Sequence, residues 1–159
     1  KRKYEGRGEM LLRAYFGLAF KFACIIAILT VFFPGLGLAD EAEAEKAAII
    51  SEARAYFEAE LSGDTKAIWN ALAPSSVFKR QYSYDDYVAI QSKADLAVKD
   101  YEVVEVSEVM ENNDTAVLPG VEKLAAVKVR VRLKSKDGKE SEHNNIFIFL
   151  KENGKWLKG

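Results

Sequence analysis

The apolar and polar residues of this chain repeat with a different period in each of three regions. The first 39 residues contain a long uncharged apolar run. From there to about residue 100, apolar side chains recur every three or four residues, and from Tyr101 onward many of them alternate with polar ones. A helical period followed by a period of two predicts an α+β domain in which helices precede strands.

The first predicted helix begins in the acidic, alanine-rich stretch at residues 40–46. Carboxylates in a first turn favour the start of a helix because they interact well with its dipole. Helical spacing then continues to Leu61 and places four apolar residues on one face, namely Ile50, Ala53, Phe57 and Leu61. We expect this face to pack against the rest of the domain.

Two further helices are indicated by residues that end or begin helices. Gly63 suits the left-handed position after a helix, and Asp64 suits the N-cap of a short second helix. Ser83 and Asp86 have the spacing of a capping box, so a third helix is expected to start there and to continue to about Val98.

The alternating region predicts an antiparallel meander. Asp137-Gly138 and Asn153-Gly154 are dipeptides that favour two-residue hairpin turns. The predicted strands span residues 101–110, 124–134 and 139–151, and a last strand begins at residue 155. The second of them alternates valine or leucine with lysine or arginine, which is typical of a sheet with one buried and one solvated face.

A two-residue turn at Asp137-Gly138 fixes which strand residues share a face, because Lys136 would then pair with Lys139. The face toward the helices would carry Val127, Val129, Val131, Asn144, Ile146 and Ile148. The opposite face would carry Lys128, Arg130, His143, Phe147, Phe149 and Trp156.

Three sequence motifs in this order resemble those of the nuclear transport factor 2-like superfamily. They are ARAYFEAELSGDTKAIWNALAPSSVF at residues 53–78, SYDDY at residues 83–87 and NGKW at residues 153–156. The superfamily includes ketosteroid isomerase, scytalone dehydratase and the SnoaL-like polyketide cyclases. The resemblance implies a cone-shaped α+β fold over residues 40–159, with three N-terminal helices packed on a curved antiparallel sheet.

The N-terminal region is predicted to be a leader over residues 1–39. Met10 could be the initiator, which would make residues 1–9 an artefact and residues 10–39 a signal peptide. Phe22–Phe33 has the length of a signal h-region, and small residues before Asp40 predict cleavage after Ala39. The alternative is a retained membrane anchor, although the uncharged run is shorter than the roughly 20 residues that span a bilayer.

Composition excludes several classes of function. The net charge of −1 provides no basic field, so we expect no nucleic-acid partner. Cys24 is the only cysteine and lies in the predicted leader, and His143 is the only histidine. We therefore expect no metal site, no cofactor and no catalytic residue set of the Ser-His-Asp kind.

A ligand pocket is predicted between the helices and the sheet. Tyr82, Tyr84 and Tyr87 cluster at the start of the third helix, and tyrosines of this kind can line a cavity. Asn144 would place an amide on an otherwise apolar face, where it needs a hydrogen-bond partner or a ligand. These four residues are the pocket candidates, and packing and structural hydrogen bonding are the alternatives.

A homodimer is predicted through the outer face of the sheet. The expected register leaves Phe147, Phe149 and Trp156 there beside Arg130. Exposed aromatic side chains with an arginine are typical of interface centres, and an apolar patch of this kind seldom stays open on a soluble monomer.

These observations favour a periplasmic or secreted, non-catalytic binding or assembly domain with a small apolar ligand. One alternative, implied by the resemblance, is a lyase or isomerase of the ketosteroid-isomerase type. Another is an accessory subunit of an envelope or secretion machine, anchored in the membrane by a retained leader.

Export can be tested by expression of the chain with its own leader in a Gram-negative host. We expect the periplasmic fraction to contain a product whose mass and N-terminal sequence begin at Asp40, because the small-residue site follows the apolar run. Recovery of only the full-length chain, in the membrane fraction, would favour the anchored alternative.

Overall fold

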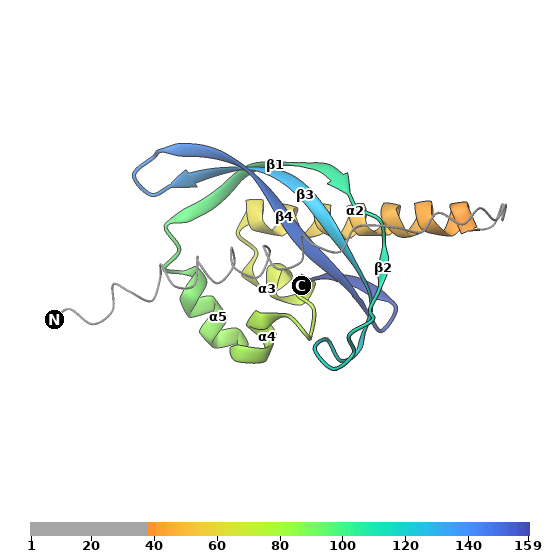
Figure 1. Ribbon diagram of the computed structural model, residues 1–159. Coiled ribbons are helices and arrows are strands. Elements are labelled where there is room, and N and C mark those ends of the chain that lie inside the picture. The colour runs from red at the N-terminus through yellow and green to blue at the C-terminus, as the bar shows by residue number, and fades with distance from the viewer. Residues whose placement is uncertain (1–37) are drawn as a thin grey trace. The chain divides into compact units, whose positions relative to one another are not determined.

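The computed structural model describes residues 38–159, in which helices precede an antiparallel sheet (Figure 1). The helices are α2 (Leu38–Ser62), α3 (Thr65–Ala71), α4 (Val77–Gln81) and α5 (Tyr84–Gln91). The strands are β1 (Leu96–Val106), β2 (Met110–Glu111), β3 (Val121–Ser135), β4 (Glu140–Glu152) and β5 (Lys155–Lys158). The predicted leader lies outside the described residues, apart from its last two positions.

The short helices begin where the capping residues predicted. The side chain of Asp64 accepts a hydrogen bond from the Ala67 N–H at the start of α3. Ser83 and Asp86 form the predicted capping box of α5. Gly63 has a φ of 68°, which a residue without a side chain adopts at little cost. The local signals for these helix boundaries are therefore confirmed.

The sheet is antiparallel, with the strand order β1-β3-β4-β5, and β2 pairs with β3 beyond the end of β1. It curls along its length, and α2 runs across one of its faces (Figure 1). We call this the inner face and the opposite one the outer face. The α+β class predicted from the sequence describes the domain correctly.

The predicted arrangement of three helices packed together on a cone-shaped sheet is wrong. Among the described residues there are four helices, and only α2 makes extensive contact with the strands, chiefly β1 and β5. Helix α3 packs on α2, and α5 packs on α3, so the short helices form a group beside the sheet (Figure 1). The sequence period identified helices but carried no information on what each one packs against.

The β3–β4 hairpin has a three-residue turn where the sequence predicted two residues. Ser135 donates its N–H to the carbonyl of Lys139, and Gly138 lies in the left-handed region with a φ of 87°. A left-handed third residue is typical of three-residue hairpin loops. The extra turn residue shifts the pairing by one, so Val131 lies opposite His143 and Val129 opposite Asn145.

A shift of one residue moves every side chain of β4 to the other face. Val127, Val129 and Val131 are buried on the inner face, as predicted. The placements on β4 are wrong, because Ile146 and Ile148 are 66% and 43% exposed on the outer face.

The inner face and α2 together form the main core. The buried residues of α2 are Ile49, Ala53, Tyr56, Phe57 and Ala59. Phe57 stacks on Tyr101 of β1 and meets Phe147 of β4 edge to face, with ring centroids 5.2 and 5.1 Å apart. Leu61, predicted to share this buried face, is instead exposed.

A partly buried ion pair attaches the first half of α2 to the sheet. Glu45 Oε1 accepts hydrogen bonds from Lys123 at 3.1 Å and Lys151 at 2.7 Å, and these lysines pair across β3 and β4. Burial raises the pKa of Glu45, but the two lysines outweigh it and bring that pKa below its ordinary value. The carboxylate therefore stays ionised between the helix and the sheet.

Two aspartate substitutions test the corrected register. Val129→Asp should lower the free energy of unfolding by about 3–5 kcal/mol, because it places an unpaired charge in the core. Asn144→Asp should change it by less than about 0.5 kcal/mol, because the side chain is exposed opposite Arg130. Urea denaturation of both variants measures the difference, and a large loss in Asn144→Asp would restore the register predicted from the sequence.

Candidate functional site

A cleft of about 270 Å³ opens between the short helices and the start of β1. The end of α2, helices α3 and α5, and the first residues of β1 all contribute to its walls. The lining residues are Glu60, Gly63, Thr65, Ile68, Val88, Gln91, Ser92, Ala94, Leu96, Ala97 and Val98.

The cleft exists because the chain turns sharply after α5. The sequence predicted that this helix continues to about Val98, but it ends at Gln91 and β1 begins at Leu96. The turn is held against the β3–β4 hairpin, where the Lys136 N–H donates to the Asp95 carbonyl at 3.1 Å. One wall of the cleft is therefore formed by the start of a strand whose residues the sequence predicted to be helical.

The lining combines apolar side chains with a few fixed polar groups. Ile68, Val88 and Leu96 provide apolar surface, and Leu96 is 53% exposed. Gln91 donates from Nε2 to the Tyr87 hydroxyl at 2.6 Å, which orients its amide. Such a mixture suits a ligand that has an apolar body and one or two polar atoms.

Glu60 is the acidic side chain of the cleft. It accepts a hydrogen bond from the Tyr56 hydroxyl at 2.6 Å, and its charge also acts on the buried Lys158. The carboxylate thus connects the wall of the cleft with the core beneath β5.

The three predicted pocket tyrosines lie together, but none of them lines this cleft. They belong to an aromatic cluster in which Tyr87 and Tyr84 contact Trp69, and Tyr82 contacts Phe78. Tyr87 is buried, and its hydroxyl accepts a hydrogen bond from Gln91, which lines the cleft. The cluster packs the short helices together, which is the alternative that the sequence left open.

Asn144 is on the outer face, not in a pocket between helices and sheet. It is exposed and pairs with Arg130 across the strands. The shifted register explains the error, because an inner-face position was predicted only from the two-residue turn.

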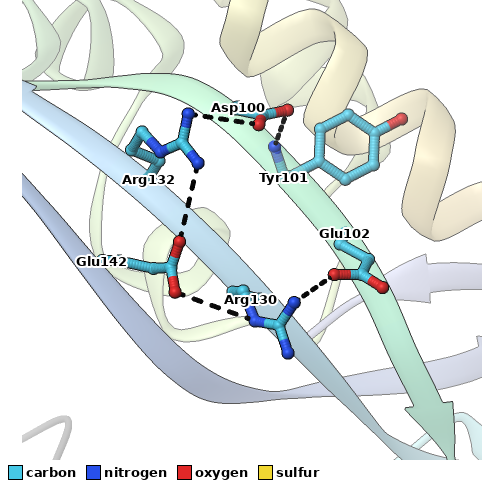
Figure 2. Close-up of a pocket in the computed structure, with 6 residues that line it drawn as sticks. All are labelled: Asp100, Tyr101, Glu102, Arg130, Arg132 and Glu142. Atoms are coloured by element: carbon cyan, nitrogen blue, oxygen red, sulfur yellow. Dashed lines mark hydrogen bonds and ion pairs between the residues drawn. The ribbon is translucent and has the colours of Figure 1, made fainter.

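The outer face carries a network of charges centred on β3. Arg132 lies 3.7 Å from both Asp100 of β1 and Glu142 of β4, and Arg130 bonds Glu102 of β1 at 2.5 Å and lies 3.8 Å from Glu142 (Figure 2). These side chains line a shallow hollow of about 100 Å³. Exposed ion pairs of this kind add little stability, so their main effect is to give the face alternating charge.

The aromatic residues predicted at a dimer interface are not on this face. Phe149 is 1% exposed and Trp156 is 5% exposed, and both belong to the main core. Phe147 packs on Phe57 of α2. Of the four residues predicted for the interface, only Arg130 is on the outer face, so the aromatic patch that motivated the dimer is absent there.

The part of the chain that the structure describes also bears on metal binding and on membrane crossing. Residues 38–159 contain no group of three or more His, Cys, Asp or Glu side chains placed to bind a metal ion. The helices in this range include none with the length and apolar character needed to cross a membrane.

Comparison with known proteins gives little similarity. No protein-family model matches the chain, and no curated protein matches its sequence. The chain is similar to the solution structure of a SEC-C motif containing protein from Rhodopseudomonas palustris, with 18% identity and a TM-score of 0.45, over 65% of this chain and 68% of that one.

The predicted membership of the nuclear transport factor 2-like superfamily is wrong. No protein-family model supports it, and the packing of the helices differs from the arrangement that the resemblance implied. The motifs that suggested it have local explanations. Gly63-Asp64 ends one helix and caps the next, and Asn153-Gly154 forms a hairpin turn with both residues at positive φ.

The pH dependence of stability tests the burial of Lys158 on β5. Burial lowers the pKa of Lys158 from 10.5 to about 8, although the charge of Glu60 opposes this. Between these pH values the unfolded chain holds a proton that the folded chain has lost. The free energy of unfolding should therefore rise from pH 8 to about 10, by on the order of 2–3 kcal/mol.

Above pH 10 the trend should reverse. Burial and the hydrogen bond to Glu58 raise the pKa of Tyr101 from 10.0 to about 12, so the folded chain then holds the extra proton. Chemical denaturation at each pH measures both trends. Lys158→Met should abolish the rise, and Lys155→Met, at an exposed position of the same strand, should keep it; a rise that survives in Lys158→Met contradicts this account.

Proposed function

We propose that this chain is a non-catalytic binding domain, which holds a small ligand or a partner's side chain with an apolar body in the cleft beside α5. The observation that supports this most directly is the cleft itself, with its apolar walls and oriented amide. Val88 and Leu96 expose apolar surface there, and a bound molecule would remove that surface from water.

The side chains of the cleft support binding more than acid–base catalysis. Its lining includes one carboxylate, Glu60, which already accepts the Tyr56 hydroxyl, and it includes no histidine. A general acid or base must reach the atom whose proton it transfers. The alternative of a ketosteroid-isomerase-type enzyme depended on the superfamily resemblance and is not retained.

Binding can be tested with N-phenyl-1-naphthylamine, a neutral dye whose fluorescence increases in apolar surroundings. We expect the folded chain to bind it saturably at one site. Val88→Lys, which places a charge in the cleft, should weaken binding by about tenfold or more. Ile90→Lys is the matched control, because Ile90 is similarly exposed on the same helix but does not line the cleft.

Two results would contradict the proposal. One is a wild-type chain whose fluorescence signal does not saturate, and the other is an equal loss of affinity in the Val88→Lys and Ile90→Lys variants. Circular dichroism of each variant must first show the helical content of the wild type, so that a loss of binding is not a loss of folding.

A further inference from the structure

The outer face exposes apolar side chains between its charged end and the small apolar core around Leu150. Ile146 and Ile148 are 66% and 43% exposed on β4, and their cross-strand partners are Lys128 and Ala126 of β3. Adjacent exposed isoleucines on a sheet face are unusual for a monomer in water, because their apolar surface stays in contact with the solvent. This patch is separate from the cleft, which lies beside α5.

The outer face consists of cross-strand rows, each with one residue from β3 and one from β4, and the two residues of a row differ in charge or in size. Basic residues of β3 lie beside acidic residues of β4 at one end, and the two isoleucines of β4 lie toward the other end. The rows are Lys134 with Glu140, Arg132 with Glu142, Arg130 with Asn144, Lys128 with Ile146, and Ala126 with Ile148. Each row therefore has a hydrogen-bond donor or a small residue on β3, and a hydrogen-bond acceptor or a large apolar residue on β4.

We infer that this face binds a second copy of the chain, sheet against sheet. A two-fold axis parallel to the strands and midway between β3 and β4 brings β3 of one copy over β4 of the other, with equal rows facing each other. Arg132 then faces Glu142 of the second copy, and Ile148 faces its Ala126. An isologous interface of this kind needs a self-complementary surface, which the rows provide.

An axis placed directly over β3 or β4 loses this complementarity. An axis over β3 brings its lysines and arginines against the same residues of the second copy, and like charges in contact oppose association. An axis over β4 places Glu140 and Glu142 opposite themselves. An axis between β1 and β3 would also bring basic residues over acidic ones, but it would leave the isoleucines of β4 uncovered. The charges and the isoleucines together thus select one dimer, in which the isoleucines are covered by the small Ala126 and the aliphatic stem of Lys128.

Charge reversal with mixing tests this dimer. Sedimentation velocity of the full chain at tens of micromolar should show a dimer. Arg132→Glu alone and Glu142→Arg alone should each weaken it by about tenfold or more, because each variant places like charges across the axis. An equimolar mixture of the two should restore dimers, because both cross-axis pairs are then oppositely charged.

The mixture separates a specific interface from loss of folding, which mixing cannot repair. Ile90→Lys is the control for an added charge away from the outer face, and it should remain dimeric. A monomeric wild type, a dimer unaffected by Arg132→Glu, or a mixture that stays monomeric would each overturn the inference. The dye-binding cleft is tested separately, so either proposal can fail without the other.

Discussion

The pairing of β3 with β4 determines which surface of this domain is core and which is solvent. The run Ile146–Leu150 is apolar at every position, so its own pattern does not say which residues point inward. The choice depends on the turn between the strands, where Gly138 in the left-handed region makes a loop of three residues. With that register, Phe147 and Phe149 face α2, and the isoleucines between and beside them face solvent.

Two kinds of contact hold helix α2 against the inner face of the sheet. Near the start of the helix, Glu45 binds a cross-strand pair of lysines. In the second half, Phe57 packs on aromatic rings from β1 and β4. An unpaired buried charge is costly, so the ion pair favours one position of the helix along the sheet, whereas the apolar contact supplies most of the burial.

Local features of this fold were predictable from the sequence, and long-range ones were not. The caps at Asp64 and Ser83 and the alternation of β3 depend on neighbouring residues, and all were predicted correctly. The start of β1 was missed, because bulges after Val98 and Val103 break its alternation. The cleft could not be found from the sequence, since it lies between elements that are distant in the chain, and the tyrosines beside it signal packing as readily as binding.

The irregularities of β1 also bear on how the domain can associate. This strand lies at the edge of the sheet, where unpaired backbone groups could recruit another strand. Its two bulges interrupt the regular spacing of those groups, and Lys99, the extra residue at the first bulge, forms an ion pair with Glu140 of β4. Bulges and charges are the usual protection of an edge strand. Because this edge is protected in this way, association through a face of the sheet is favoured over pairing along β1, and the outer face is the one that α2 leaves uncovered.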